Sequence, residues 1–535
     1  MQSFFVTDSE KNFIAPNNSK PKLLAVDSLF PLFSQFGQGY FSTDFFNKAL
    51  VSVYFLRGGN IKGDVIKKVL SYAENIGQFT LKEDAGSERP KSIDPGSIVR
   101  LAYICGQEKR GPLLSSLQTL KIDGATTTLC QLPLFLTPSL RSVEISNVQK
   151  PFHENILVFL SSLADEAPLL THLSFGSGCT PADWLPTWFK FGKLRHLDIT
   201  DCMDLQSCDV LQTLGTLMEL ESLKLDVKWS TQYVGRSDRR MNPAIFGGDM
   251  KKDDAASTTS KPGFLTSWFI NLKTLSVTSQ LKIMDDLLSL IDSKNMQSIS
   301  LDLIPEQGSL ADKVISSLEL FKQSTGKWAN TLVNISLQLP EEKKKTAAAA
   351  AFPKLSSEDL EILLKPQNLE KLDISGIGLN FTPFDSLSSK KLTKLKELHL
   401  PLHKGSSYLT FESLRRVAET FPRLISFRCG IDLCSHVPQY SNTSAGNSNL
   451  LAHPLEILHV GKSNAVSNAF AMEEQRLLDI ARHLNILFPN LKRIEVSKDE
   501  SDFCRWESID RMVKLCQSTR LDETCRPPSS QFCTI

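Results

Sequence analysis

The sequence predicts an α/β solenoid in which a curved parallel sheet lines the concave face and helices cover the outside. Three observations predict it: a short apolar motif recurs at regular spacing, amphipathic segments lie between its copies, and Pro residues separate the two. The chain has 535 residues, more than a single globular core usually contains. An elongated array accommodates this length because each repeat packs only on its neighbours.

The recurring motif is seen in LRHLDITDC, residues 194–202, where Leu-x-x-Leu-x-Ile alternates apolar and polar side chains. This alternation predicts a strand of about five residues with one buried face, and we expect Cys202 to turn inward at the following bend. A looser form, Leu-x-x-apolar-x-apolar with some Ile or Met starts, recurs along the chain. It begins at Ile76, Leu117, Leu140, Leu170, Leu194, Leu220, Leu272, Met296, Leu332, Leu369, Leu395, Leu424, Leu455 and Leu491.

The motif starts are spaced like structural repeats. Successive starts are separated by 23, 30, 24 and 26 residues between Leu117 and Leu220, and by 26, 29 and 31 residues between Leu369 and Leu455. The step of 52 residues from Leu220 to Leu272 equals two such units. Polar segments lengthen some of the steps and predict disordered insertions. These insertions lie near 229–263, 340–353 and 435–450.

Segments between the motifs are predicted to be helical. In ESLRRVAETFPRL and EEQRLLDIARHLNILFPNL the apolar residues recur at three- and four-residue steps. Pro422 and Pro489 stand near the ends of these segments, where they end the helix and direct the chain into the next strand. A strand, turn and helix in about 26 residues cannot bury its apolar faces alone, whereas stacked copies can. We therefore expect a leucine-rich repeat domain over residues 71–516.

The regions flanking the repeats are expected to differ from them. Residues 1–70 are interpreted as a small helical region, with helices at STDFFNKALVSVYFL (42–56) and KGDVIKKVLSYAENI (62–76). Residues 517–535 are interpreted as a flexible C-terminal tail.

Composition excludes several classes of function. The 60 Lys and Arg residues balance 59 Asp and Glu residues, which gives no field for nucleic acid or an anionic membrane surface. The sequence shows no signal peptide and no apolar run long enough to span a membrane. Eleven scattered Cys residues fit a reducing compartment. We therefore expect an intracellular protein, cytoplasmic or nuclear or both.

Catalytic and metal-binding alternatives are weak. GQGYFS, residues 37–42, lacks the third glycine of a phosphate-binding loop. His399 and His403 are four residues apart, but the segment predicts a strand interrupted by Pro401, so they do not converge on a metal. The C-terminal cysteines contain no Cys-x-x-Cys pair. They are Cys504, Cys516, Cys525 and Cys533. We expect no enzymatic activity, no cofactor and no metal site.

Binding is expected on the concave face of the repeats. Polar residues that flank the apolar strand positions point away from the core and form rows of mixed charge. Such rows can form charge-assisted hydrogen bonds to a protein surface. The candidate binding residues are His196, Asp198, Lys224, Asp226, Lys371, Asp373, His399, Arg428, His459, Arg493 and Glu495.

Phrases within the repeats resemble a known family. The stretches LTPSLRSVEI and APLLTHLSF, continued by LEKLDISGIGLNF, resemble the repeat region of fungal F-box proteins with degenerate leucine-rich repeats. The resemblance covers roughly residues 70–500. Residues 1–70 contain no match to the F-box itself, which usually begins near Leu-Pro-x-Glu and ends near a Cys-x-x-Trp-like element. The F-box is therefore diverged, lost or missing from the gene model.

The resemblance implies a substrate receptor of a cullin-based ubiquitin ligase. In this hypothesis the repeats hold a protein target on the concave face, and residues 1–70 dock the ligase adaptor. The alternative is a leucine-rich repeat interaction scaffold unconnected to ubiquitination. Co-purification of the adaptor distinguishes the two hypotheses.

Overall fold

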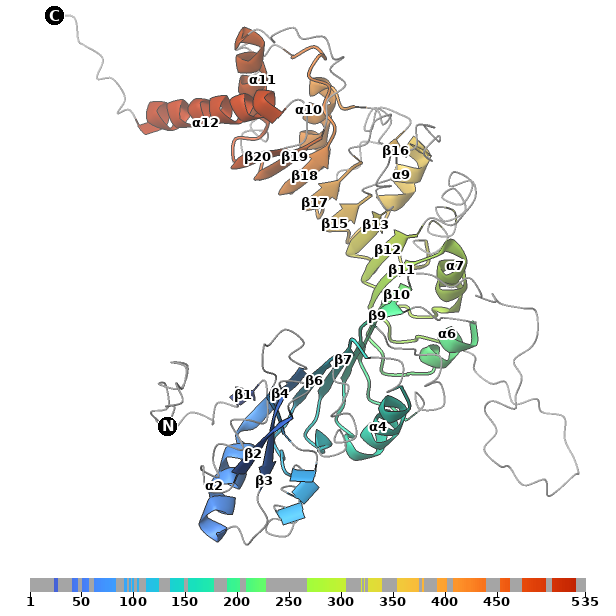
Figure 1. Ribbon diagram of the computed structural model, residues 1–535. Helices are drawn as coiled ribbons and strands as arrows, with labels where there is room; N and C mark the ends of the chain where they lie inside the picture. Colours follow the sequence, from blue (N-terminus) through green and yellow to red (C-terminus); the bar gives the residue numbers. More distant parts are fainter. Residues whose placement is uncertain are drawn as a thin grey trace, which may run out of the picture. The chain divides into compact units, whose positions relative to one another are not determined.

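The structure is a computed structural model of the chain (Figure 1). It describes residues 24–26, 41–46, 51–56, 62–82, 91–93, 96–97, 99–100, 103–104, 112–124, 135–148, 153–177, 190–202, 208–227, 267–304, 319, 322, 326–338, 354–374, 378–379, 392–401, 408–438, 453–461, 474–496 and 503–525. The predicted insertions lie outside these residues, apart from 435–438. The chain divides into two compact units, Met1–Leu194 and Arg195–Ile535, here called unit 1 and unit 2.

Unit 1 contains a parallel sheet with the strand order β1-β4-β6-β7-β8. The strands are β1 (Leu24–Val26), β4 (Ile76–Lys82), β6 (Thr119–Asp123), β7 (Ser142–Ser146) and β8 (His172–Phe175). Leu120, Val143 and Leu173 lie opposite one another on successive strands and are buried. Alternation of apolar and polar residues thus places one apolar row under the sheet.

Unit 2 continues the same pattern in a parallel ladder with the order β9-β10-β11-β12-β13-β15-β17-β18-β19-β20. The strands are β9 (His196–Cys202), β10 (Ser222–Val227), β11 (Thr274–Ser279), β12 (Ser298–Leu303), β13 (Asn334–Gln338), β15 (Lys371–Asp373), β17 (Glu397–His399), β18 (Ser426–Cys429), β19 (Ile457–Val460) and β20 (Arg493–Val496). Leu223 on β10 lies opposite Leu275 on β11, and both are fully buried. Leu398, Phe427 and Leu458 continue the buried row on β17 to β19.

Every motif start predicted from the sequence leads into one of these strands. The strand begins two residues after the start in each case except β4, which begins at Ile76 itself. Leading residues such as Leu194 and Leu272 are buried, because they turn under the sheet just before the strand. Cys202 ends β9, where it lies opposite Val227. The strand predictions and the leucine-rich repeat fold are therefore confirmed.

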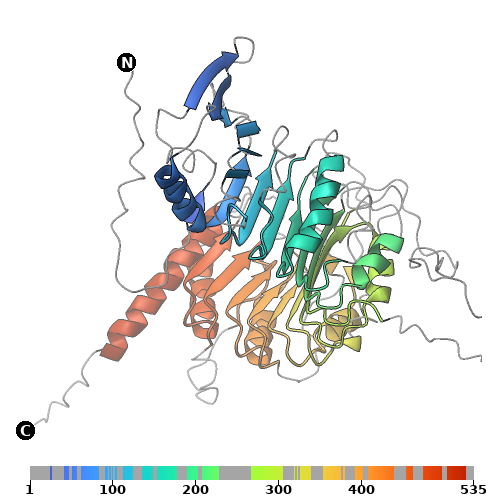
Figure 2. The same cartoon turned by 90° about the horizontal axis from the view of Figure 1, so that it is seen from below.

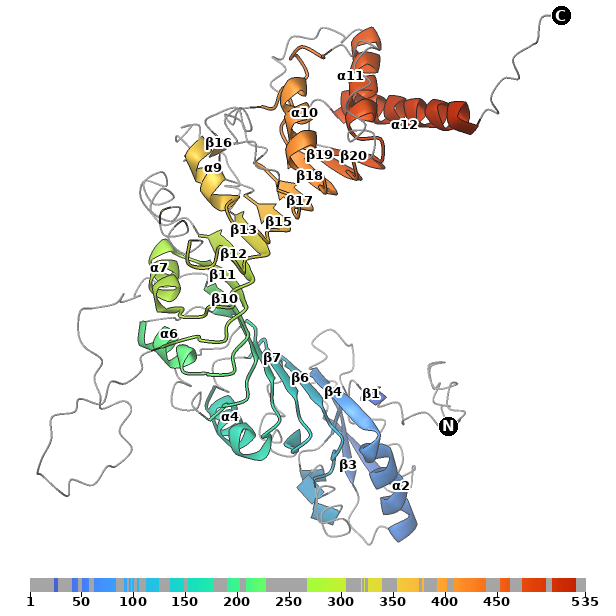
Figure 3. The same ribbon diagram turned by 180° about the vertical axis from the view of Figure 1, so that it is seen from behind.

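Helices cover one face of each sheet, α4 in unit 1 and α6, α7, α9, α10 and α11 in unit 2 (Figures 1 and 3). They are α4 (His153–Glu166), α6 (Cys208–Gly215), α7 (Leu281–Leu290), α9 (Ser357–Leu363), α10 (Phe411–Thr420) and α11 (Glu474–Leu487). The helices α10 and α11 confirm the two predicted from apolar periodicity. Pro422 and Pro489 lie in the turns that follow them, as expected from the missing N–H of proline.

Side chains at the helix starts and in the turns fix the repeats locally. Ser356 and Asp359 form a capping box at the start of α9, with bonds of 3.2 and 2.8 Å. A second device recurs just before the strand, where an asparagine one residue ahead of the leading leucine donates to a backbone carbonyl of the preceding repeat. These bonds run from Asn271 to Met218 (2.8 Å), from Asn368 to Asn330 (2.6 Å) and from Asn490 to His453 (3.1 Å).

The N-terminal region differs in part from the prediction. The helix expected over 62–76 is confirmed as α2 (Gly63–Glu74), but the helix expected over 42–56 is wrong. This segment forms β2 (Phe41–Phe46) and β3 (Val51–Leu56), which pair antiparallel, and β3 also pairs with β5 (Lys91–Ile93). The β-branched and aromatic residues of VSVYFL favour an extended chain.

The C-terminal region also differs from the prediction. The flexible tail expected from residue 517 is wrong over 517–525, because α12 (Phe503–Cys525) continues through them. Asp510 accepts a 3.0 Å bond from the N–H of Ile494 on β20, and Gln517 donates to the carbonyl of Leu491 at 2.9 Å. Trp506 on the same helix is fully buried. The helix therefore covers the last repeat and satisfies part of the free backbone of β20.

Candidate protein-interaction surface

The outward side chains of the strands of unit 2 form a surface that we call the strand face. They occupy the first, third and fifth strand positions and point away from the buried positions under the helices. Most of them remain partly exposed, whereas Asp373 on β15 is buried. The helices of unit 2 lie on the opposite side of its strands (Figure 2). Because the strands pair in register, each outward position forms a row across neighbouring repeats.

The central row contains most of the residues predicted to bind. It consists of the third strand positions Asp198, Lys224, Ser276, Ser300, Ser336, Asp373, His399, Arg428, His459 and Glu495. The remaining predicted residues lie in the flanking rows: His196, Lys371 and Arg493 at the first position, and Asp226 at the fifth. The structure therefore brings the candidate residues onto one face, as expected, with charged groups toward both ends and serines between.

At the N-terminal end of unit 2 the charges pair with each other. Lys224 Nζ lies 3.1 Å from a carboxylate oxygen of Asp198 on the neighbouring strand. The same row position in unit 1 holds Lys121 and Glu144, whose charged atoms are 2.6 Å apart and which the sequence reasoning missed. These ion pairs are exposed or half-exposed, so each stabilises the fold by less than about 1 kcal/mol.

The middle of the strand face is neutral apart from two carboxylates. Asp226 and Asp302 occupy the fifth position on either side of Thr278. Burial raises the pKa of Asp302, and the negative charge of Asp226 raises it further. Asp302 was not among the predicted binding residues, although it has the same offset from Met296 as Asp226 has from Leu220.

The C-terminal end of the strand face has the densest set of ionic contacts. They pair Lys371 with Glu397 (2.7 Å), Asp373 with His399 Nδ1 (3.2 Å), His459 Nδ1 with Glu495 (2.8 Å) and Arg493 with Glu495 (2.7 Å). All of these residues except Glu397 were predicted as binding candidates. The structure shows that they contact one another, three of the pairs across neighbouring strands and Arg493 with Glu495 within β20.

Two histidines meet over β18 in this part of the face. The rings of His399 and His459 are 5.9 Å apart, centroid to centroid, although they belong to β17 and β19. Arg428 lies between them in register and forms no hydrogen bond or ion pair with the described part of the chain. Burial lowers the pKa of His459, Glu495 opposes this shift, and His399, Arg428 and Arg493 add to it.

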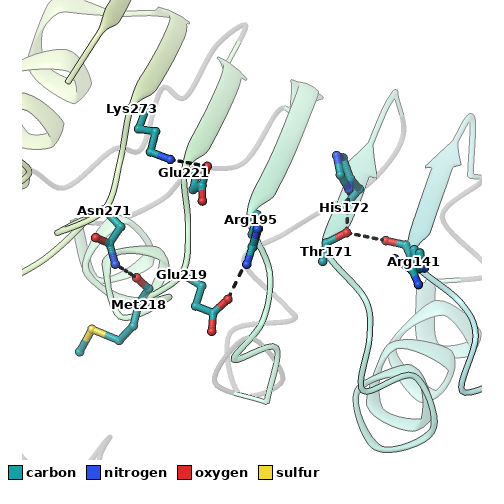
Figure 4. Close-up of polar contacts among 9 residues, drawn as sticks. All are labelled: Arg141, Thr171, His172, Arg195, Met218, Glu219, Glu221, Asn271 and Lys273. Carbon is teal, nitrogen blue, oxygen red and sulfur yellow. Dashed lines mark hydrogen bonds and ion pairs between the residues drawn. The ribbon is translucent and has the colours of Figure 1, made fainter. Parts of the chain in front are cut away.

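A further row of ion pairs lies just before the strands, one residue after each leading leucine. These pairs are Glu221 with Lys273, Glu370 with Lys396 and Glu456 with Lys492, each at 2.8 Å. Figure 4 shows the first of them, together with the contact between Arg195 and Glu219 and the bond from Asn271 to Met218. The hydrogen bond from Lys273 lowers the pKa of Glu221. Their common offset from the leucine was a signal in the sequence that could have revealed them.

The chemistry of a metal or thiol site is not assembled in the described residues. Among them, no group of three or more His, Cys, Asp or Glu residues could hold a metal ion. His403 lies outside the described residues, as does Cys533, while Cys504 and Cys516 are separate free thiols on α12. None of the described helices is long and apolar enough to cross a membrane.

No family model matches the chain, and no curated protein sequence matches it. Similar solved structures include a leucine-rich repeat protein from Leptospira interrogans, with 13% identity, a TM-score of 0.33, and coverage of 80% of this chain and 98% of that chain. A chain in the yeast complex of Rad7 and Elc1 has 15% identity, a TM-score of 0.29, and coverage of 71% and 87%. TLR13, solved with ssRNA13, has 14% identity, a TM-score of 0.28, and coverage of 79% and 46%. With TM-scores this low, the assignment of the chain as a leucine-rich repeat solenoid rests on its own registered strands and covering helices.

Proposed function

We propose that the chain is a non-enzymatic scaffold that recognises a partner protein on the strand face of unit 2. The observation that carries this proposal is the central row, in which successive strands present polar side chains in register. Neighbouring strands are about 4.8 Å apart, so the row samples a partner surface at short, regular intervals. Rigid strands position these groups better than loops do.

The distribution of charge favours a protein over a polyanion. The strand face carries both signs within a few ångströms, as in the pair of Asp198 with Lys224 and the pair of Lys371 with Glu397. A nucleic acid would require an excess of positive charge, and the chain has a net charge of +1. Alternating charges instead match a protein surface that has its own mixed charges.

A more specific proposal is that the chain acts as a substrate receptor of a cullin-based ubiquitin ligase. Its support is the resemblance of the repeat phrases to fungal F-box proteins with leucine-rich repeats. In this proposal residues 1–70 dock the ligase adaptor while the strand face holds the target. The alternative is a scaffold with no link to ubiquitination.

Affinity purification of the full-length chain tests recognition by the strand face. We expect a partner that is recovered with the wild-type chain to be lost when Lys224 and Lys371 are both replaced by Glu. The matched control is Arg482→Glu, because Arg482 is exposed on α11, which covers the other face of the sheet. Partners retained by the double variant, or lost equally from the control, would contradict the proposal.

Adaptor recovery tests the more specific proposal. We expect the adaptor to co-purify with the full chain and to be lost when residues 1–70 are deleted, while the strand-face partner remains. Because β1 pairs with β4, the thermal unfolding of the truncated chain is measured in parallel. A full chain that recovers its strand-face partner without adaptor would leave the scaffold alternative.

A further inference from the structure

Among the residues that the structure describes, Arg428 is a cation on the strand face without a counterion. It occupies the third position of β18, and within the described part of the chain its guanidinium has no hydrogen-bond or ion-pair partner. Its neighbours in the row, His399 and His459, are each held by a carboxylate. A half-buried guanidinium with unused donors is a suitable partner for a planar carboxylate.

The two histidines form the sides of this site. Nδ1 of His399 lies 3.2 Å from Asp373, and Nδ1 of His459 lies 2.8 Å from Glu495. A carboxylate accepts hydrogen bonds, so each Nδ1 donates and each Nε2 is directed away from its carboxylate. The ring separation of 5.9 Å shows that the two rings lean from β17 and β19 toward each other across β18, where they meet edge to face.

The balance of charge decides which anion fits. With neutral imidazoles, and counting the described residues of the central row on β15 to β20 together with Arg493, the two cations Arg428 and Arg493 balance the two carboxylates Asp373 and Glu495. A dianionic phosphate would be repelled by these two carboxylates, and the single guanidinium of Arg428 would neutralise one of its two charges. A carboxylate adds a single negative charge, which Arg428 can neutralise through two parallel hydrogen bonds.

We infer that Arg428, flanked by His399 and His459, is a docking site for an aspartate or glutamate side chain of a partner protein. The inference rests on the proposed function, because it specifies what the strand face recognises. Arg428 supplies the charge and the fork of donors. The imidazoles lie on the two strands that flank Arg428.

Binding of the partner's carboxylate is coupled to protonation of His459. When His459 is neutral and Nδ1 donates to Glu495, Nε2 has a lone pair and repels an incoming carboxylate. Protonation turns Nε2 into a donor, so the bound carboxylate favours the charged imidazole. The groups that face His459 are His399, Arg428, Arg493 and Glu495, and Asp373 faces the second ring. Affinity therefore rises as the pH falls toward the pKa of His459.

A peptide selection on the full-length chain tests the inference. A displayed library of random peptides is selected on the wild-type chain at pH 6.5, and the enriched sequences are synthesised. We expect an enriched Asp or Glu at one fixed position, with replacement of that residue by Asn or Gln weakening binding about tenfold. We also expect binding to weaken several-fold between pH 6.5 and pH 8.

Matched variants assign the effect to Arg428. Arg428→Gln keeps most of the side chain and should reduce affinity for the acidic peptide about tenfold, whereas Arg428→Lys should retain part of it. His459→Asn should remove the pH dependence. Arg482→Gln removes one positive charge on α11 and should leave binding unchanged. Unfolding temperatures within a degree of wild type show that the variants remain folded.

Each outcome separates this inference from the proposed function. Peptides that bind without an acidic anchor, or that bind Arg428→Gln as well as wild type, would overturn the carboxylate site and leave the scaffold intact. A phosphoserine at the anchor that binds more tightly than glutamate would overturn the choice of a carboxylate. Failure to select any peptide that competes with the strand-face partner would contradict the proposed function itself.

Discussion

Strands β11 to β13 and strands β17 to β20 share one backbone pattern and differ on their outward face. Leu275 and Leu458 occupy the same buried position in the two regions, and both are fully buried. At the adjacent outward position the first region presents Ser276, and the second presents Arg428 or a histidine. The buried positions repeat because every strand packs on the same apolar row, whereas the outward positions are free to vary.

This difference indicates where recognition and stability reside. Apart from Asp302, the strands β11 to β13 present uncharged outward side chains, many of them with hydroxyl groups that can bond to any polar surface. The strands β17 to β20 contribute paired charges, two histidines and Arg428, which has no counterion among the described residues. Stability should therefore respond alike to buried substitutions in both regions, while outward substitutions should affect binding in the second region.

The largest expected effect concerns the buried row. We expect Leu275→Ala and Leu458→Ala each to lower the free energy of unfolding by about 2–5 kcal/mol, because each opens a cavity beneath the sheet. Urea unfolding of the two variants measures the loss. A small loss at one site and a large loss at the other would show that the two regions do not share one kind of core.

The second-largest expected effect is a loss of stability at low pH, which arises in the C-terminal repeats. Burial lowers the pKa of His483 on α11 to about 4, and its Nε2 donates to the carbonyl of Phe411 at 3.0 Å. The folded chain thus keeps this ring neutral, while the unfolded chain binds a proton below about pH 6.5. The contribution of His483 to the free energy of unfolding is fully present above about pH 6.5, and it is lost as the pH falls from 6.5 toward 4.

At pH 5.0 the loss from His483 should reach about 2 kcal/mol relative to pH 7.5. Urea unfolding of the wild type and His483→Gln at both pH values measures it. We expect the variant to lose less stability than the wild type on acidification. The same loss in both proteins would assign the pH dependence to other groups.

A smaller effect concerns the asparagines that connect successive repeats. We expect Asn271→Ala and Asn490→Ala each to cost about 1 kcal/mol, because each removes a hydrogen bond to a backbone carbonyl of the previous repeat. Asn295→Ala is the matched control, since Asn295 has the same offset from its motif start and its side chain forms no such bond in the structure. Thermal unfolding ranks the three variants, and an equal loss at Asn295 would contradict the role of the bond.

The smallest expected effect on stability comes from the outward charges. We expect Asp198→Ala and Lys224→Ala to change the free energy of unfolding by less than about 0.5 kcal/mol, since the pair is half-exposed and water screens its charges. Chemical denaturation of the single and double variants measures the coupling between them. A cost comparable to that of a buried leucine would mean that the outward face is part of the core.

The sequence predicted the repeat strands well because burial imposes the same spacing on each of them. It did not predict β1, since Leu24–Val26 is too short to show the motif. Residues 42–56 were taken for a helix because their apolar residues also fit helical spacing, and pairing between β2 and β3 decided otherwise. Residues 517–525 of α12 were expected to be a flexible tail because their stabilising contacts, such as Gln517 with Leu491, are not visible in the local sequence.

The candidate face was predicted residue by residue, but its contacts were not. Alternation along a strand indicates that Asp373 and His399 point outward, yet it does not show that they face each other. Aligning the repeats on their leading leucines would have placed both residues at the same offset, with Arg428, His459 and Glu495. The lean of the two histidines over β18 depends on side-chain packing and could not be read from spacing.

Amide hydrogen exchange of the free, full-length chain tests the common ladder most directly. Protected amides should recur at each predicted strand, with similar protection in β11 to β13 and in β17 to β19, because all of these strands are paired on both sides. The residues that follow a leading leucine should be protected as well, since they donate to the preceding repeat. Strand amides that exchange as fast as those of the predicted insertions would contradict the account.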